Sequence, residues 1–449
     1  MRIHFISIGG SVMHQLAIAL QHKGYLVTGS DDEIFEPAAG NLKKEGILPE
    51  KTGWFPENIT PDIDAIILGM HAKADNPELL KAMELGLKIF SFPEYIYQES
   101  INKKRVAIGG SHGKTSTTAM VMHVLQYAHV DFDYLVGARL TGFDQSVRIT
   151  NAPIIVCEAD EYPASTLEKR PKFHFLFPHI AVITGIAWDH INVFPTFGFY
   201  LEQFIIFINK IEKNGVLIYN ETDEVLKKLV AENLRDDISY IPYHLPDYFI
   251  ENGITSVNIG KEKTALKVFG NHNLLNLQAA YLVCKELKLD DATFTKAISG
   301  FAGAAKRLEL IAGEKDWNIY RDFAHAPSKV TASINAVKQQ FPERKLVAIL
   351  ELHTFSSLNA EFMNEYKGSM DKADKAIVFY SNHALELKRM KPLDPKSVMN
   401  GFQKANIEVI TERKNLEEIL SKENLNYTNF LFMSSGNYDG MDILKILKK

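Results

Sequence analysis

The stretch that decides the fold of this chain reads Gly110-Ser111-His112-Gly113-Lys114-Thr115-Ser116-Thr117-Thr118. A short apolar run at 105–109 precedes it, and a run with helical character at 118–125 follows it. A strand, a glycine loop, a Lys-Thr pair and a helix together predict a nucleotide triphosphate site, because glycines let backbone N–H groups approach phosphate oxygens. In this pattern Lys114 neutralises the β- and γ-phosphates and Thr115 reaches Mg²⁺. Ile108 stands where the usual pattern has its first glycine, so the loop is a shorter variant, and a plain glycine-rich turn is the alternative.

The composition is typical of several globular domains. The chain has 449 residues, of which 46% are hydrophobic and 23% charged, and this length suggests about three domains. A net charge of −5 provides no basic field that would attract nucleic acid or an anionic membrane. Cys157 and Cys284 lie far apart in apolar runs, so we expect buried thiols.

The sequence contains no membrane-spanning run of roughly 20 apolar residues. The apolar start at 1–10 is short and runs into a glycine turn, which indicates a first strand rather than a signal peptide. We therefore expect a cytoplasmic protein.

Strand-like and helix-like runs alternate, which predicts an α/β fold built on doubly wound parallel sheets. The expected strands are 3–8, 25–28, 65–69, 153–157, 180–184, 215–219, 317–320, 346–350, 376–380, 407–410 and 430–433. The expected helices include 12–23, 77–87 and 274–287, and 260–267 is a basic-polar stretch. We expect three domains, at 1–104, 105–307 and 308–449.

The first strand leads into Gly9, Gly10 and Ser11, and the second leads into Asp31. A glycine pair after one strand and an acid after the next are similar to a dinucleotide-binding fold. The third glycine of that fingerprint is absent, so a tight turn explains the pattern equally well.

Titratable side chains follow two strands of the central part. Glu158-Ala159-Asp160-Glu161 comes directly after one strand, and Asp189-His190 follows the next. Ligands gather at the carboxyl ends of parallel strands, and Mg²⁺ prefers oxygen ligands. We expect Glu158 and His190 to share one metal ion, whereas a solvated acidic turn and a structural histidine are the alternatives.

Other polar residues lie close to predicted element ends. Asn273 and Asn276 are three residues apart on one helical face, where they can meet adenine or cap the helix. Arg307 stands at the junction to the third domain, where a hinge arginine stabilises phosphoryl charge on closure and a surface arginine is the alternative. Asp322 and His325 follow the strand expected at 317–320.

Taken in order, these motifs resemble those of the Mur ligases, the ATP-dependent amide-forming enzymes of peptidoglycan precursor synthesis. The motifs are Gly-Ser-His-Gly-Lys-Thr, Glu-Ala-Asp-Glu, Asp-His, His-Asn-x-x-Asn, Lys-Arg and Asp-Phe-Ala-His-x-Pro. The resemblance covers essentially the whole chain. It implies an N-terminal domain for a UDP-sugar, a central P-loop-type ATPase domain, and a Rossmann-like C-terminal domain that holds the amine and closes on the site.

The resemblance also implies ATP and Mg²⁺ as cofactors and a role for each candidate residue. The catalytic residues would be Lys114, Glu158, His190 and Arg307. ATP would contact Gly110, Ser111, His112, Gly113, Lys114, Thr115, Ser116, Asn273, Asn276, Arg307, Asp322 and His325. The metal ligands would be Thr115, Glu158 and His190, and the UDP-sugar would contact Gly9, Gly10, Ser11 and Asp31.

Two branches of the family compete for this chain. One joins L-alanyl-γ-D-glutamyl-meso-diaminopimelate to UDP-N-acetylmuramate in peptidoglycan recycling, and the other adds L-alanine to the same UDP-sugar in de novo synthesis. The loop at 9–13, Glu161-Tyr162, the long segment 163–177 and the glycine loop at 433–440 resemble the tripeptide branch. Ala326 stands where both branches often have a second histidine, and 351–357 lacks the Glu-Pro-Arg-Ser form of the tripeptide branch and partly resembles the alanine branch.

Members of two other classes are rivals. A folylpolyglutamate synthase-like ligase shares the central domain but lacks a UDP-sugar domain, and a non-catalytic nucleotide sensor would not need Lys114, Thr115, Glu158 and His190. The lysine that several sister ligases carbamylate is absent between His190 and Lys210, as expected for the two branches considered.

Overall fold

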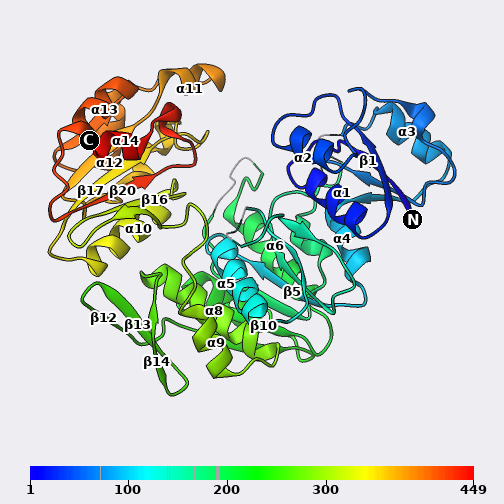
Figure 1. The fold of residues 1–449 in the computed structure, drawn as a ribbon, viewed down its shortest axis with the longest axis horizontal. Helices are drawn as coiled ribbons and strands as arrows, with labels where there is room; N and C mark the ends of the chain where they lie inside the picture. The colour runs from blue at the N-terminus through cyan, green and yellow to red at the C-terminus, as the bar shows by residue number, and fades with distance from the viewer. Residues whose placement is uncertain (71, 139, 141, 166, 189–192, 449) are drawn as a thin grey trace. The chain divides into compact units, whose positions relative to one another are not determined.

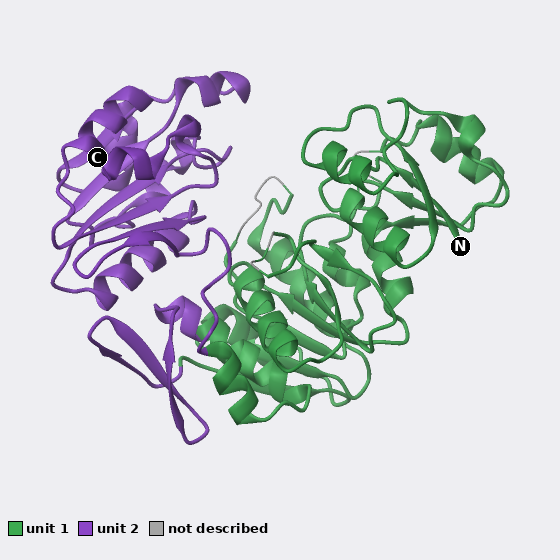
Figure 2. Cartoon of the chain, viewed as in Figure 1, with its two compact units in different colours: residues 1–245, 275–298 green, residues 246–274, 299–449 purple. Residues whose placement is uncertain are grey.

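The computed structural model describes residues 1–70, 72–138, 140, 142–165, 167–188 and 193–448. They form two compact units, 1–245 with 275–298 and 246–274 with 299–449 (Figure 2). Each unit contains sheets flanked by helices (Figure 1), and each is described by itself below. The domain bounds expected at 104 and 307 remain predictions.

The first unit begins with a four-stranded parallel sheet in the order β2-β1-β3-β4. Its strands are β1 (Arg2–Ile6), β2 (Leu26–Ser30), β3 (Ala65–Leu68) and β4 (Ile89–Ser91). The accompanying helices are α1 (Met13–His22), α2 (Ala38–Lys44), η1 (Pro56–Asn58), α3 (Pro77–Glu84) and α4 (Phe92–Ser100). The strand expected at 3–8 ends earlier, at Ile6, because Ser7 turns the chain with φ of +71°.

The same unit contains a seven-stranded sheet in the order β11-β10-β9-β5-β8-β6-β7, parallel except for β7. Its strands are β5 (Lys104–Gly109), β6 (Asp133–Leu135), β7 (Val147–Arg148), β8 (Ile154–Glu158), β9 (Ile180–Ile183), β10 (Val216–Asn220) and β11 (Ser239–Tyr243). The accompanying helices are α5 (Lys114–Tyr127), η2 (Lys172–Phe175), α6 (Phe197–Asn209), α7 (Glu224–Glu232), α8 (Asn271–Glu286) and α9 (Asp291–Ile298), and residues 271–274 at the start of α8 are counted with the second unit. The central strands β5, β8 and β9 are mostly buried, and their middle residues are apolar, as expected for parallel strands covered on both faces.

The second unit contains a six-stranded sheet in the order β15-β16-β20-β17-β18-β19. Its strands are β15 (Glu309–Gly313), β16 (Asn318–Asp322), β17 (Lys345–Glu351), β18 (Lys375–Phe379), β19 (Ile407–Ile410) and β20 (Thr428–Met433). Its helices are α10 (Pro327–Gln340), η3 (Ala360–Tyr366), α11 (Asn382–Leu387), α12 (Pro395–Phe402), α13 (Arg413–Ser421), η4 (Tyr438–Gly440) and α14 (Ile443–Leu447). Only β15 runs antiparallel among the pairs described in this sheet. The α/β class expected from the sequence is confirmed.

A second, antiparallel sheet in this unit was not predicted. It consists of β12 (Tyr248–Glu251), β13 (Ile254–Ile259) and β14 (Glu262–Leu266), so the supposed basic-polar stretch at 260–267 is largely a strand. The missed signal is Asn252-Gly253, which joins β12 to β13 with φ of +54° and +74°. Asn-Gly with positive φ at both residues is a strong hairpin signal.

Two element boundaries differ from expectation at candidate site residues. Helix α8 begins at Asn271 rather than 274, so Asn273 and Asn276 both lie inside its first turns. Strand β16 extends through Asp322 instead of ending at 320, so Asp322 is the last residue of the strand.

Cys157 and Cys284 are both buried free thiols, as predicted, and burial raises the pKa of Cys157 to about 12. Among the helices of the described residues, none combines the length and apolar character needed to cross a membrane.

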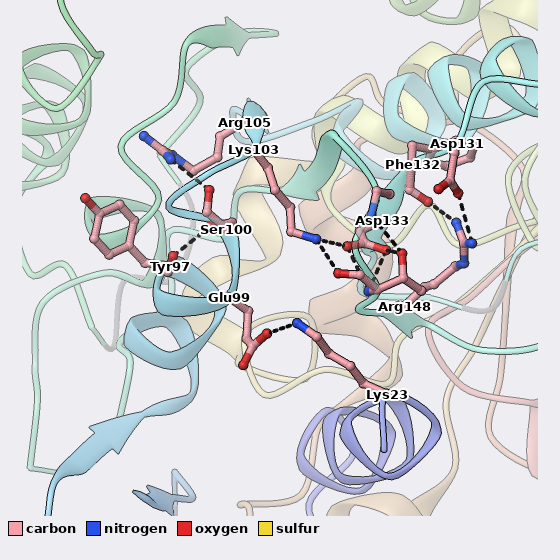
Figure 3. Close-up of polar contacts among 12 residues, drawn as sticks. Lys23, Tyr97, Glu99, Ser100, Lys103, Arg105, Asp131, Phe132, Asp133 and Arg148 are labelled. Atoms are coloured by element: carbon pink, nitrogen blue, oxygen red, sulfur yellow. Dashed lines mark hydrogen bonds and ion pairs between the residues drawn. The ribbon is translucent and has the colours of Figure 1, made fainter. Parts of the chain in front are cut away.

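A buried ion pair fixes the residue just before β5 to the start of β6. Lys103 Nζ binds a carboxylate oxygen of Asp133, and the two side chains are only 7% and 0% exposed (Figure 3). Lys103 Nζ also donates to the carbonyl of Thr150 (2.6 Å), and the Thr150 hydroxyl donates to Asp133 (2.7 Å). Both charged groups of the pair therefore have hydrogen-bond partners besides each other, as a buried ion pair requires.

Replacing Lys103 by Met is expected to lower the free energy of unfolding by about 3 kcal/mol, because Asp133 would remain buried without its counter-ion. Urea denaturation measures this change. The matched control is Lys81→Met, which removes a surface pair with Glu84 (33% and 67% exposed) and is expected to cost less than about 1 kcal/mol. Equal losses in the two variants would contradict this account of the cluster.

Candidate active site

The phosphate loop connects β5 to α5 and depends on two glycines with positive φ. Gly110 has φ of +123°, and a Cβ there would lie 2.3 Å from Thr184 Oγ1. Gly113 has φ of +86°, and a Cβ there would lie 2.3 Å from Asn276 Oδ1. Both positions therefore require glycine, and Asn276 lies directly against the loop.

Hydrogen bonds tie the loop to the segment after β9. The Ser111 N–H donates to the carbonyl of Gly185 (3.0 Å), and the Ala187 N–H donates to Ser111 Oγ (2.8 Å). The hydroxyls of Ser111 and Tyr200 are 2.8 Å apart. The loop is thus bonded to the segment that leads towards Asp189 and His190, which themselves lie outside the described residues.

Lys114 opens α5, and its ammonium group is held by the chain itself. Lys114 Nζ lies 2.7 Å from Glu161 Oε2 and 2.7 Å from the carbonyl oxygen of Gly110. Burial lowers the pKa of Lys114, but the negative charges of Glu161, Asp160 and Glu158 raise it by more. The net shift of the Lys114 pKa is therefore upward. Lys114 therefore stays positively charged at neutral pH, as a ligand for phosphate must.

The acidic run after β8 is divided between different partners. Asp160 pairs with Lys172 at 2.7 Å rather than with Lys114. Burial raises the pKa of Asp160, but Lys172 and Lys114 lower it by more. The chain then folds back on itself: Pro163 bridges Pro171, and the Lys172 N–H donates to the carbonyl of Tyr162 (2.9 Å). This hairpin, closed at Tyr162 and Lys172, keeps the acidic run at the end of the strand.

Thr115 and Glu158 form the part of the expected metal site that the structure describes. Thr115 Oγ1 donates to Glu158 Oε1 (2.8 Å), and the Gly137 N–H donates to the other carboxylate oxygen (3.0 Å). Within the described part of the chain, no group of three His, Cys, Asp or Glu side chains comes together as a metal site. Mg²⁺ usually takes one or two carboxylates together with water and substrate phosphates, so a carboxylate beside a threonine hydroxyl fits this ion.

The remaining candidate nucleotide residues lie in the loop, in the first turn of α5 and at the start of α8. Ser116 is buried in the first turn of α5, and the His112 carbonyl accepts a hydrogen bond from Thr184 Oγ1. Asn273 belongs to the second unit, where its side-chain N–H donates to the carbonyl of Phe269 (2.9 Å). Its contact with adenine therefore remains a prediction.

In the second unit, three sequence motifs come together at the end of β16. The Phe323 N–H donates to the carbonyl of Lys306 (2.8 Å), and the Arg307 guanidinium lies 4.9 Å from the centre of the Phe323 ring. Buried Asp322 accepts a hydrogen bond from the Ser333 hydroxyl. Burial lowers the pKa of His272, and the negative charge of Asp322 partly opposes this shift. The motifs that contain His272, Arg307 and Asp322 are thus neighbours, a result that the sequence spacing alone did not give.

His325 holds a local bond to its own loop. One of its ring nitrogens, Nδ1, lies 2.8 Å from the carbonyl oxygen of Phe323, and the Tyr366 hydroxyl donates to the His325 carbonyl. The nucleotide roles of Arg307, Asp322 and His325 remain predictions.

The two segments expected to read the acceptor meet at the ends of β17 and β20. Buried Glu351 accepts hydrogen bonds from the Ser434 hydroxyl and from the Tyr438 N–H (2.9 Å). Burial raises the pKa of Glu351 despite these bonds and despite the nearby His353, and Asp439 raises it further. A Cβ on Gly436 would lie 2.8 Å from the Glu351 carboxylate, so the glycine loop packs directly on the 351–353 segment.

In the first sheet, Asp31 binds the glycine loop itself. The Gly9 N–H donates to Asp31 Oδ2 (2.7 Å), and the Ser7 and Ile8 N–H groups donate to the carbonyl of Ser30 (2.9 and 3.1 Å). Burial raises the pKa of Asp31 to about 6, although the Gly9 N–H opposes this shift. The expected neighbours Gly9 and Asp31 are therefore in contact, and their role towards a UDP-sugar remains a prediction.

We expect the Asp31 carboxyl to titrate near pH 6 instead of its ordinary 3.8. Since the folded state then holds a proton that the unfolded state has lost, Asp31 reduces the free energy of unfolding as the pH rises from about 4 to about 6. Carbon NMR of the labelled carboxyl measures the midpoint. A midpoint below pH 4.5 would contradict the assigned burial.

Comparison with known proteins finds three Mur ligase family models along the chain. Residues 2–103 match the Mur ligase family catalytic domain, residues 108–284 the Mur ligase middle domain, and residues 306–436 the Mur ligase glutamate ligase domain. The UDP-N-acetylmuramate–L-alanine ligase of Clostridium kluyveri is 31% identical, over 84% of this chain and 82% of that protein.

Two solved structures share the fold. The murein peptide ligase of Psychrobacter arcticus is 22% identical, with a TM-score of 0.63 over 100% of this chain and 98% of that one. The UDP-N-acetylmuramate–alanine ligase of Thermotoga maritima is 23% identical, with a TM-score of 0.67 over 100% and 97% of the two chains.

The three family models, together with the three-domain α/β architecture, identify an ATP-dependent ligase. The chain belongs to the Mur ligase family and is an ADP-forming acid–amino-acid ligase of peptidoglycan synthesis.

Proposed function

We propose that this enzyme joins L-alanyl-γ-D-glutamyl-meso-diaminopimelate to UDP-N-acetylmuramate at the cost of ATP, as a step of peptidoglycan recycling in the cytoplasm. The observation that carries the ligase chemistry is the cluster of Lys114, Thr115 and Glu158 at the carboxyl ends of β5 and β8. It combines a fixed cation for phosphate with oxygen ligands for Mg²⁺.

The reaction has two steps. The lactyl carboxylate of UDP-N-acetylmuramate attacks the γ-phosphorus of ATP, the bond to ADP breaks, and an acyl phosphate forms. The α-amine of the acceptor then attacks the acyl carbon, phosphate leaves with the bonding electron pair, and the amine loses a proton. The protein forms no covalent bond to substrate, so its contribution is to position the groups and to neutralise charge.

The described residues have distinct roles in the first step. Lys114 neutralises the β- and γ-phosphates, and the N–H groups in the first turn of α5 donate to phosphate oxygens. Thr115 and Glu158, together with His190, would hold Mg²⁺, which reduces the repulsion between phosphate and carboxylate when bound. Asn276 would contact adenine from beside the loop, with Asn273, and Arg307 and Asp322 would reach the nucleotide after closure.

Two features support the tripeptide as acceptor. The hairpin that follows Glu161 belongs to the long segment typical of the tripeptide branch, and the Asp160–Lys172 pair anchors it beside the phosphate loop. The titratable groups that face Glu351 are His353 and Asp439. An acidic group at this edge, such as Asp439, suits an acceptor with a second ammonium group, such as diaminopimelate, better than free L-alanine, whose single ammonium group is the reacting nitrogen itself.

L-Alanine is the second candidate acceptor. The curated relative at 31% identity adds L-alanine, and the 351–357 segment lacks the arginine expected of the tripeptide branch.

Release of phosphate from ATP with Mg²⁺ and UDP-N-acetylmuramate separates the two acceptors. We expect turnover with the diaminopimelate tripeptide and at least a hundredfold lower kcat/KM with L-alanine, since a missing charged contact is worth about 3 kcal/mol. Efficient turnover with L-alanine alone would instead assign the enzyme to de novo synthesis.

Replacing Lys114 by Ala is expected to reduce kcat by at least about a hundredfold, because the developing charge on the transferred phosphoryl group loses its fixed cation. Circular dichroism should show an intact fold. Near-normal kcat in the folded variant would disprove the role of Lys114.

A further inference from the structure

The cation that should bind nucleotide phosphate already has a carboxylate partner. Lys114 Nζ lies 2.7 Å from Glu161 Oε2, and the two side chains are 15% and 1% exposed. A second bond, to the Gly110 carbonyl at 2.7 Å, folds the lysine over its own loop. An ammonium group has three donors, so two of them point at groups of the protein rather than at a phosphate.

The backbone around Glu161 is held in place independently of Lys114. The Phe173 N–H donates to the carbonyl of Asp160 (3.1 Å), and the Lys172 N–H donates to that of Tyr162 (2.9 Å). Glu161 therefore lies between two residues, Asp160 and Tyr162, whose carbonyl groups are hydrogen-bonded to the other strand of the hairpin. When Lys114 turns to a phosphate, this carboxylate stays buried beside a triphosphate of the same charge.

We propose that Glu161 is a positioning residue that holds Lys114 in the absence of nucleotide and competes with the β- and γ-phosphates for it. This inference rests on the proposed function, because it assumes that ATP occupies the phosphate loop. Glu161 limits the affinity for ATP and for ADP alike, and it recaptures Lys114 when ADP leaves. The strand-end position of the residue thus serves product release rather than metal binding.

Asp160 provides a matched control for the general effect of removing one negative charge near the loop. It is adjacent in sequence, and its charge also acts on Lys114, but its hydrogen-bonded partner is Lys172. Asp160→Asn and Glu161→Gln each remove one negative charge near the loop, and only the second removes the direct competitor of phosphate.

Calorimetric titration with ATP in the presence of Mg²⁺ tests the proposal on the full-length protein. Glu161→Gln is expected to lower the Kd for ATP about tenfold, the effect of one charged hydrogen bond, and the Kd for ADP by a similar factor. Asp160→Asn is expected to change either Kd less than about threefold. In steady state, Glu161→Gln should lower the KM for ATP and also lower kcat, because ADP leaves more slowly.

An unchanged or higher Kd for ATP in Glu161→Gln would overturn the inference, and so would an equal gain in Asp160→Asn, which would indicate a general charge effect. If Glu161→Gln does not fold, as judged by circular dichroism, Glu161→Asp serves instead. It withdraws the carboxylate by one methylene, and it must also tighten ATP binding for the proposal to stand. A wild-type protein that binds no ATP would overturn the proposed function itself, whereas normal wild-type binding without a gain in the variant overturns this inference alone.

Discussion

The buried positive charge of Lys114 is the constraint on which the structure around the central sheet depends most. A buried ammonium group is stable only if carboxylates and carbonyls surround it, and here Glu161 and the Gly110 carbonyl meet that need. The geometry then follows outward. Gly110 must have positive φ to bring its carbonyl to the lysine, Thr184 fills the space that a side chain there would occupy, and the hairpin base holds Glu161 at the end of β8. The same charge that the fold must compensate is the charge that nucleotide phosphate requires.

In each of the three mainly parallel sheets, a carboxylate at the end of a strand accepts a hydrogen bond from a backbone N–H group of another loop. Asp31 follows β2, Glu158 ends β8, and Glu351 ends β17. Each lies at the carboxyl end of a strand, where the loop that follows a neighbouring strand supplies an N–H group and where ligands of α/β proteins gather. Asp31 binds the amide of Gly9, Glu158 that of Gly137, and Glu351 that of Tyr438. The carboxylates thus hold the backbone of neighbouring loops in place at these three strand ends.

The sequence allowed the α/β class, the phosphate loop and most strands to be predicted, because buried parallel strands are continuous apolar runs and a Gly-Lys-Thr sequence between a strand and a helix is typical of phosphate loops. The sequence alone did not predict contacts between distant segments. The pairing of Lys114 with Glu161, and of Asp160 with Lys172, depends on how the hairpin closes, and nothing in the spacing distinguishes the two acids. The antiparallel sheet of 248–266 was missed because its strands contain no long apolar run, although Asn252-Gly253 offered a signal. The start of helix α8 was predicted three residues too late, because the first turn of the helix is polar and lacks the apolar periodicity used to predict helices.

The central claim is that the lactyl carboxylate is phosphorylated at the loop that contains Lys114. Isotope transfer tests it most directly. UDP-N-acetylmuramate labelled with ¹⁸O in both carboxylate oxygens is turned over with ATP, Mg²⁺ and whichever acceptor supports the reaction, and the released phosphate is weighed by mass spectrometry. The account predicts one ¹⁸O atom in each phosphate, because the bridging oxygen of the acyl phosphate comes from the carboxylate. Phosphate that contains no ¹⁸O, released together with a normal amide product, would contradict it.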